Sequence, residues 1–195
     1  MARNEERRIT DVGTLKALAH PLRMQLYRLL FVAEAATASQ LAEQVDEAVS
    51  LVSYHLRKLA EHGLVEAAEP RSGDARERWW QPASDGVSIR DEDFQDAPEK
   101  VAAHLAASRL FLEQRAGMYL RYLDERAHWG TDWHEAAHDS ESLLRLTAGE
   151  LAQLKKDVHD VLKRYDELGR GREAVGDTEG REHVALHVYG FPFRV

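Results

Sequence analysis

The 195-residue chain contains no cysteine and no long apolar run. Without cysteine it has no disulfide, no thiolate metal site and no cysteine nucleophile, so its ten histidines are the nitrogen ligands that remain to be considered. Its apolar runs are only a few residues long, too short to span a bilayer. The charged start MARNEERRIT lacks the apolar segment of a secretory signal. We therefore expect a cytoplasmic protein that makes no membrane contact.

The sequence also lacks the motifs of common enzymes. The stretch GRGREAVG follows a predicted helix rather than a strand and has no Lys-Ser/Thr end, so it is not a phosphate-binding loop. We find no G-x-S-x-G elbow and no HE-x-x-H motif. The acidic run Asp91-Glu92-Asp93 lies in a polar connector and indicates solvated carboxylates. We expect no enzyme, no catalytic residue and no cofactor.

Charge is unevenly distributed along the chain. The formal net charge is -8, but residues 1–83 carry 11 basic and 12 acidic side chains, so the acidity lies mostly downstream. A hydrophobic fraction of 44% is enough for a folded core. Because a DNA-binding protein needs only a local basic face, the acidic total does not exclude nucleic acid as a partner.

The N-terminal part shows helical periodicity. Apolar residues at helical spacing predict helices over 12–19, from Leu22 to about Val32, and over 39–45. The Pro of His20-Pro21 suits the first turn of the second helix, and Thr37 or Ser39 can cap the third.

The segment SLVSYHLRKLAEHGLV, residues 50–65, has two different faces. Val52, Leu56 and Leu59 are spaced i, i+4, i+7 and form a predicted core stripe. The opposite face carries small or polar residues: Ser50, Ser53, Tyr54 and Arg57. Gly63 is a natural helix end.

The sequence after Gly63 predicts a hairpin. LVEAAEP reads as a strand, RSGDA as a turn and RERWWQP as a second strand. Alternation along that strand places one of Trp79 and Trp80 in the core and leaves the other partly exposed. Helix, turn, helix and hairpin is the order of a winged helix-turn-helix.

The remaining chain is predicted to be mostly helical. An acidic connector over 84–97 leads into a long predicted helix from Pro98 to about Trp129. A short strand at LLRL (143–146) precedes a second helix, which is capped by Thr147 and Glu150 and runs through Leu168. The chain then continues with a Gly-rich loop over 169–180 and a terminal strand over 183–193. The fold class is thus α+β, mostly α. We expect residues 1–83 to form a winged helix-turn-helix DNA-binding domain, 84–97 an acidic linker, and 98–195 a C-terminal helical dimerisation and possible effector region with a terminal strand.

These residues resemble the ArsR/SmtB-like winged helix-turn-helix regulators of bacteria. The matching positions are His20-Pro21-Leu22-Arg23, Leu41-Ala42, Val52-Ser53, His55-Leu56, Leu59 and Gly63-Leu64-Val65. The resemblance covers roughly residues 12–83 and implies a homodimeric transcription factor, usually a repressor. Such a factor binds double-stranded DNA and releases its operator when a small-molecule effector binds.

The resemblance also implies a set of DNA-binding residues. It places Ser50, Ser53, Tyr54 and Arg57 toward the major groove, His55 and Lys58 at the flank near the core edge or the phosphates, and Arg71, Arg76 and Arg78 on the wing. Arg can make bidentate contacts with guanine, and each Lys or Arg on a phosphate adds to salt sensitivity. The chain departs from the family pattern at Asp46-Glu47-Ala48, where a Gly, an apolar residue and a Ser are common, so we expect the helix cap to shift to Ser50.

Alternative interpretations remain open from the sequence. The domain can instead be a winged-helix module that binds protein, or a metal-responsive sensor through His134 and His138, which are four residues apart. A solvated helix face is favoured for the two histidines, so we assign no metal. Trp129 and Trp133 can line an effector pocket, although a core or dimer interface is favoured. For Arg7-Arg8 a solvated tail is favoured over a phosphate contact.

Overall fold

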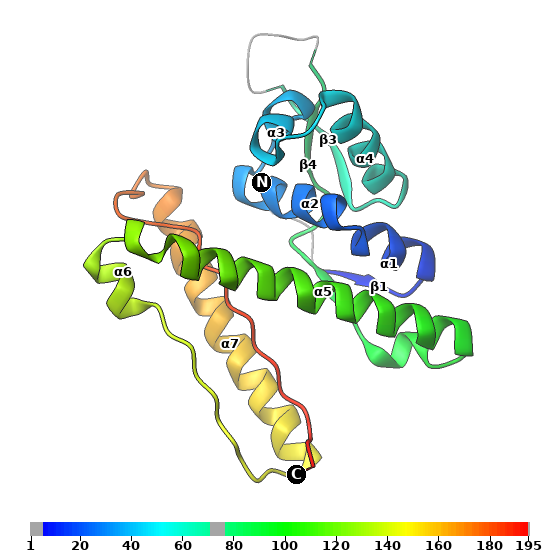
Figure 1. Ribbon diagram of the computed structural model, residues 1–195, viewed down its shortest axis with the longest axis vertical. Helices are drawn as coiled ribbons and strands as arrows, with labels where there is room; N and C mark the ends of the chain where they lie inside the picture. The colour runs from blue at the N-terminus through cyan, green and yellow to red at the C-terminus, as the bar shows by residue number, and fades with distance from the viewer. Residues whose placement is uncertain (1–5, 71–76, 195) are drawn as a thin grey trace. The chain divides into compact units, whose positions relative to one another are not determined.

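The computed structural model describes residues 6–70 and 77–194 (Figure 1). The chain divides into two compact units, residues 1–124 and 125–195. Helices dominate and the strands are short, which confirms the predicted mostly helical α+β class. None of the helices within the described residues combines the length and the hydropathy that a membrane span requires.

The first unit combines a helical core with two small sheets. In chain order its elements are β1 (Arg7–Ile9), α1 (Val12–Ala19), α2 (Pro21–Ala33), β2 (Ala36–Thr37), α3 (Ala38–Val45), α4 (Val49–Glu61), β3 (Val65–Ala68), β4 (Trp79–Pro82), β5 (Val87–Ile89), the 3-10 helix η1 (Asp91–Phe94) and α5 (Pro98–Glu125). The four predicted N-terminal helices and both hairpin strands are present. The predicted turn RSGDA lies outside the described residues.

Side chains at the helix starts explain why the first helices begin where they do. The Asp11 carboxylate accepts a hydrogen bond from the Thr14 backbone N–H at 2.7 Å, which caps α1. Pro21 occupies the first turn of α2, where its missing N–H is not needed. Thr37 and Gln40 form a reciprocal capping box at α3.

The core of the first unit is built from the predicted apolar stripes. Leu15, Leu26, Leu30, Leu41 and Leu56 are fully buried in one cluster that joins α1 to α4. Phe111 of α5 is buried in the same cluster, so the first part of α5 belongs to this core.

The three-stranded sheet has the order β2-β4-β3 with antiparallel pairing. Trp79 and Trp80 lie on the central strand, opposite Thr37 and Ala36 of β2. Both tryptophans are buried, at 7% and 4% exposure, so the prediction that one would be partly exposed is wrong. Trp80 belongs to the hydrophobic core cluster, whereas Trp79 is buried outside that cluster.

The predicted connector over 84–97 contains regular structure. β5 pairs in parallel with β1, in the register Arg7 to Val87 and Ile9 to Ile89. η1 follows, and its Phe94 is 1% exposed. Pairs of strands so far apart in the chain leave no local sequence pattern, so this small sheet was not predicted.

The second unit consists of helices and extended segments. Its elements are the 3-10 helix η2 (Arg126–His128), α6 (Thr131–Ala136) and α7 (Ala148–Glu173). The Thr147 and Glu150 capping box at α7 is confirmed. Four predictions need correction. α5 ends at Glu125, short of Trp129, and α7 continues through Gly169 and Gly171 into the predicted loop. The segments 143–146 and 183–193 are extended but are not strands.

Candidate nucleic-acid interface

Helix α4 is attached to the core by one side. Val52, Leu56 and Leu59 are each 0% exposed, which confirms the predicted stripe. Their burial leaves the opposite side of the helix facing solvent over its whole length. The surface of α4 therefore follows directly from its apolar periodicity.

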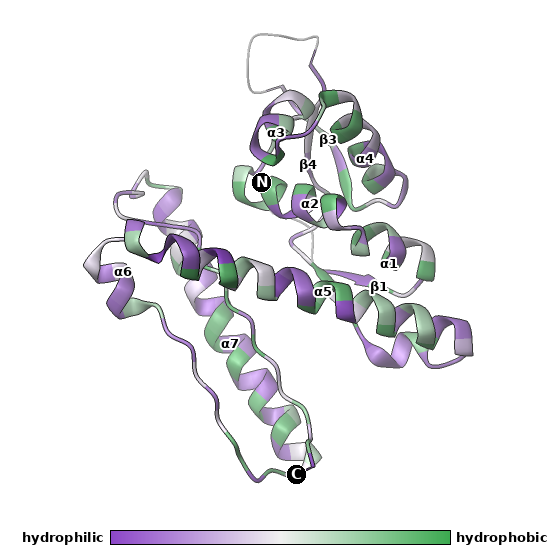
Figure 2. Ribbon diagram, viewed as in Figure 1, coloured by the Kyte–Doolittle hydropathy of each residue, from purple (hydrophilic) through white to green (hydrophobic). Residues whose placement is uncertain are grey.

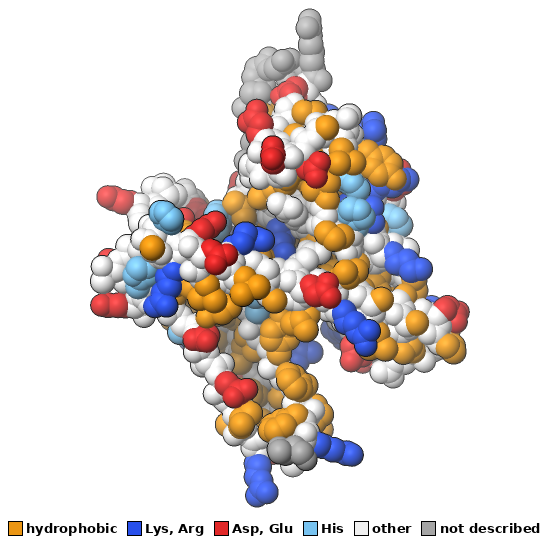
Figure 3. All heavy atoms as spheres, viewed as in Figure 1, with side chains coloured by type: hydrophobic (Ala, Val, Ile, Leu, Met, Phe, Trp, Pro, Cys, Tyr) orange, Lys and Arg blue, Asp and Glu red, His pale blue; other side chains and the backbone are white. Residues whose placement is uncertain are grey.

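The exposed side of α4 carries the residues predicted to face DNA. Ser50, Tyr54 and Arg57 are exposed and Ser53 is half-buried. The small serines leave room for close approach to a flat surface, while Arg57 projects a fixed positive charge. Figure 3 shows Lys, Arg and His side chains gathered over α4, with Asp and Glu side chains over α3 beside them.

The turn between α3 and α4 tolerates the unusual Asp46-Glu47-Ala48 sequence. Asp46 adopts the left-handed conformation, with φ of 53°, and its backbone N–H donates to the Ala42 carbonyl. Asp is one of the residues that accept this conformation at low cost. The N-cap of α4 is Ala48, which has no side-chain cap, and Ser50 lies inside the first turn. The expected shift of the cap to Ser50 is therefore wrong.

A hollow of about 270 Å³ separates α4 from the wing strand β4. Ser53 and Arg57 line it from α4, and Arg78 lines it from the wing. Arg78 stacks its guanidinium on the Trp80 ring, with Cζ 4.1 Å from the ring centroid, a cation–π contact that orients the side chain. Glu77 also lines the hollow, and its carboxylate accepts a hydrogen bond from the Ser39 hydroxyl at 2.9 Å.

Lys58 lies at the edge of the exposed face of α4. Its ammonium group is 2.7 Å from the Glu61 carboxylate and 5.8 Å from the centre of the Tyr54 ring. The hydrogen bond from Lys58 lowers the pKa of Glu61, and the same bond raises the pKa of Lys58. Because an exposed pair of this kind is worth little, Lys58 can exchange Glu61 for a phosphate at small cost.

His55 is buried at 6% exposure and faces His20 rather than solvent. The two rings are 4.6 Å apart between centroids. Burial lowers the pKa of both imidazoles, and the nearby Arg23 guanidinium adds to the effect. Arg23 itself donates to the Ala17 and Lys16 carbonyls at the end of α1. His55 thus holds α4 against the start of α2.

The C-terminal end of α4 is held by a residue that sequence reasoning missed. The Arg7 guanidinium donates to the carbonyls of His62 and Gly63, the former at 2.6 Å. A positive charge at this end complements the helix dipole. Gly63 has φ of +62°, and a Cβ there would lie 2.8 Å from the Arg7 Nη1 atom. The solvated-tail interpretation of Arg7 and Arg8 is wrong, since Arg8 also pairs with Asp93 at 2.6 Å.

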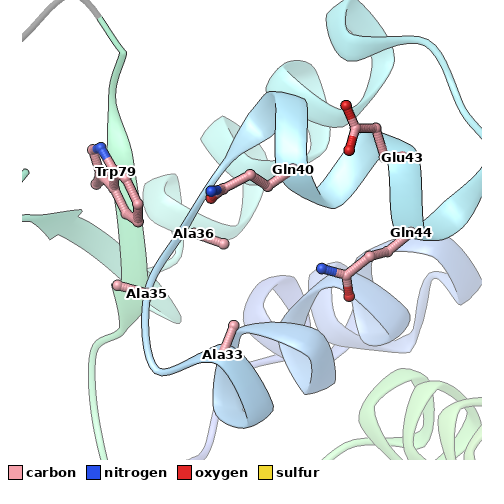
Figure 4. Close-up of a pocket in the computed structure, with 7 residues that line it drawn as sticks. All are labelled: Ala33, Ala35, Ala36, Gln40, Glu43, Gln44 and Trp79. Carbon is pink, nitrogen blue, oxygen red and sulfur yellow. The ribbon is translucent and has the colours of Figure 1, made fainter. Parts of the chain in front are cut away.

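The predicted wing residues Arg71 and Arg76 lie outside the described residues. A second hollow, of about 410 Å³, lies beside Trp79 of β4 and α3 (Figure 4). Trp79 and Ala35 lie opposite Glu43 and Gln44 across it, and Gln40 extends between them.

The histidines considered for a metal do not share a helix. α6 ends at Ala136, so His138 lies beyond it, and the ring of His134 contacts the Arg126 carbonyl. Within the described ranges, no group of three or more His, Cys, Asp or Glu side chains could hold an ion. Trp129 and Trp133 contact each other edge to face, with ring centroids 6.1 Å apart.

Comparison with known proteins bears on the N-terminal unit. Residues 18–67 match the model of a helix-turn-helix domain family. Similar solved structures include a possible transcriptional regulator for arsenical resistance, which is 27% identical, with 51% of this chain and 83% of that chain covered and a TM-score of 0.32. An ArsR family transcriptional regulator is 26% identical, with coverages of 52% and 88% and a TM-score of 0.31. The adhesin competence repressor of Streptococcus pyogenes is 12% identical, with coverages of 75% and 81% and a TM-score of 0.32. No curated protein matches the chain.

The matched residues run from the end of α1 through α4 into β3. Together with the hairpin of β3 and β4, they make the N-terminal unit a winged helix-turn-helix, as the sequence predicted.

Proposed function

We propose that this winged helix-turn-helix protein is a DNA-binding transcriptional regulator, not an enzyme, and that it acts as a homodimeric repressor on a double-stranded operator in the cytoplasm. The observation that carries the proposal is the outward face of α4. That face is small, polar and basic, and the helix is fixed to the core by Val52, Leu56 and Leu59. A rigid helix with such a face fits the major groove.

Each group on this face would have a separate role. Arg57 would read a base, because a guanidinium can bind guanine O6 and N7 together. Ser50, Ser53 and Tyr54 would contact bases or phosphates through their hydroxyls. Lys58 and Arg78 would neutralise phosphates on either side of the groove, and the predicted wing residues Arg71 and Arg76 would extend that contact.

The homodimer is supported by the apolar surface of α5. Phe111 and Ala107 face the core, while Leu105, Leu112 and Leu120 are between 53% and 59% exposed. A helix that buries one face and leaves large leucines uncovered on another is suited to pairing with a second copy. Two copies would present two α4 helices to successive major grooves.

Repression would end when a small-molecule effector binds. The hollow beside Trp79 is a candidate effector site, since it offers an indole ring, alanine walls and the polar groups of Gln40, Glu43 and Gln44. It contacts α3, the helix that precedes the turn into α4. An effector there would act directly on the geometry of the helix-turn-helix.

Selection from a pool of random duplexes tests the proposal. We expect one half-site sequence to be enriched at low salt without any ligand. Arg57→Ala should relax the base preference at one position of the half-site and cost about 1–3 kcal/mol of binding free energy. Arg78→Ala should weaken binding to all sequences alike and reduce the slope of log affinity against log salt concentration by about 1. Arg90→Ala, an exposed arginine on the linker, is the matched control. A pool that shows no enrichment would refute DNA recognition.

The second candidate is a winged-helix module that binds protein. It is favoured by the acidic groups near α4, because Glu47 is exposed and Glu77 lines the hollow with Arg57. This alternative predicts duplex binding that is absent or insensitive to salt, together with a partner retained in pull-downs. Arg57→Ala would then weaken binding of the partner protein and leave duplex binding unchanged.

A further inference from the structure

The second unit has no core of its own. Not one of the described residues in 125–194 is buried. Large apolar side chains are nevertheless exposed throughout it: Leu143, Leu144, Leu146, Leu154, Val161, Tyr165, Leu168, Val175, Val184, Leu186, Val188, Tyr189, Phe191 and Phe193. Burial of apolar surface is the main force that offsets the entropy of folding. These side chains therefore need a cover that a single chain does not supply within this unit.

Helix α7 arranges its apolar residues in a heptad pattern. Leu151, Leu154, Val158, Val161, Tyr165 and Leu168 follow one another at alternating spacings of three and four. In Figure 2 hydrophobic residues recur along α7 between hydrophilic ones. This is the spacing of positions a and d in a two-stranded coiled coil. Leu154, Val161 and Leu168 occupy the d positions and are 38%, 41% and 48% exposed.

The terminal segment leaves this stripe open. It approaches α7 at Gly190, where an added Cβ would be 3.1 Å from the Leu151 Cδ1 atom. The contact is therefore close, and it falls on an a position at the start of the helix. The d positions further along α7 stay exposed.

Charges on α7 favour a second copy of the same helix. The helix carries six basic and six acidic residues, so two copies do not repel each other by net charge. In a parallel, in-register pair, Glu150 at position g meets Lys155 at the partner's position e, which is an attractive combination. The two further g-to-e pairs, Asp157 with Leu162 and Arg164 with Gly169, bring no like charges together.

We infer that α7 pairs with α7 of a second copy as a parallel two-stranded coiled coil. The seam consists of the six heptad residues, and the pairing gives the second unit the core that it lacks. This interface is separate from the α5 surface, but it rests on the proposed homodimer. A coil of fewer than three heptads is marginal alone, and dimerisation through α5 raises the effective concentration of one α7 at the other.

The absence of cysteine makes a direct test available in the full-length chain. Val161→Cys introduces a single thiol at a d position, where the two side chains of a parallel pair meet within disulfide distance. Lys156→Cys is the matched control, because position f lies on the opposite side of α7. After mild oxidation without DNA, we expect most of the Val161→Cys protein to migrate at twice the 22.1 kDa chain mass on a non-reducing gel. The Lys156→Cys protein should remain at the single mass.

Leu168→Cys, one heptad further on, keeps the test informative if one variant folds poorly. Equal cross-linking of all three variants, or none at either d position, would overturn the coiled coil. Sedimentation equilibrium of the unmodified protein distinguishes this from failure of the homodimer. A dimer mass without d-position cross-links would reject the coil and leave the homodimer and operator binding standing.

Discussion

Single residues on the inner side of α4 decide how firmly its outer face is presented. The rings of His55 and His20 are 4.6 Å apart and tilted against each other, with Arg23 close to both, and the Nδ1 atoms of both rings are buried without a partner among the described residues. Two adjacent imidazoles beside a guanidinium tolerate each other only when the rings are neutral. The contact therefore stabilises the attachment of α4 in its uncharged form.

This contact predicts a pH dependence of stability. Because both pKa values are lowered in the folded state from an ordinary 6.5, the unfolded chain binds more protons as the pH falls through that value. The stabilisation is fully present above about pH 7 and declines below it. We expect the free energy of unfolding, measured with urea, to fall between pH 7.5 and pH 5.5. The fall should be smaller in a His20→Gln/His55→Gln variant than in the unaltered protein. His183→Gln, at an exposed site, should leave the loss unchanged.

Leu56 supplies a second prediction at this scale. Its side chain is 0% exposed in the core cluster, so Leu56→Ala should lower the free energy of unfolding by about 2–5 kcal/mol through lost burial and a new cavity. Leu51, on the same helix, is 37% exposed. Leu51→Ala should cost clearly less in the same denaturant titration, and equal costs would contradict the assigned faces of α4.

At the scale of elements, the C-terminal end of α4 is held by a residue from another element. Its N-terminus has no side-chain cap, whereas its C-terminus is capped by Arg7 of β1. Arg7→Ala should increase amide hydrogen exchange at residues 62–64 and lower stability by about 1–3 kcal/mol, the range for hydrogen bonds from a charged group. Arg8→Ala removes ion pairs with Asp93 and Glu92, neither of which belongs to α4, and should leave that exchange unchanged.

The capping box of α3 gives a prediction for the preceding helix. The Thr37 hydroxyl accepts from the Gln40 backbone N–H, and the Gln40 side chain accepts from the Thr37 N–H at 2.9 Å. Thr37→Ala should reduce the free energy of unfolding by about 1 kcal/mol. Thr37→Ser, which keeps the hydroxyl oxygen, should retain most of the stability that Thr37→Ala loses. A full loss with serine would indicate that the methyl group, not the cap, stabilises this position.

The elements of the fold also show which features could be predicted from local sequence pattern and which could not. The stripe of Val52, Leu56 and Leu59 and the cap at Thr37 were predictable, because the residues that cause them are within one or two helical turns. Arg7 and Gly63 are 56 residues apart, so their contact left no local signal. Alternation over 183–193 was typical of a strand, but no strand forms there because pairing requires a neighbour that the pattern does not specify. Of the candidate DNA-binding residues, the exposed face of α4 followed from periodicity, whereas burial of His55 depended on the distant His20.

For the whole molecule, the proposed homodimer makes a prediction about the exposed face of α5. If α5 pairs the copies, Leu112→Glu should place a charge in the interface and raise the dimer dissociation constant at least tenfold, measured by sedimentation equilibrium. Glu113→Gln, an exposed neighbour, should leave the constant unchanged. Operator affinity should fall with the dimer, since one copy contacts only one half-site. A Leu112→Glu protein that stays dimeric would move the interface away from this face.

The stacking of Arg78 on Trp80 has a spectroscopic consequence. A guanidinium that leaves the indole for a phosphate changes the local electric field around that ring, and the fluorescence of an indole responds to such fields. The chain has four tryptophans, so replacing Trp79, Trp129 and Trp133 with Phe would leave Trp80 as the sole source of tryptophan fluorescence. The wing would then carry its own optical reporter for the proposed nucleic-acid contact, without any attached dye.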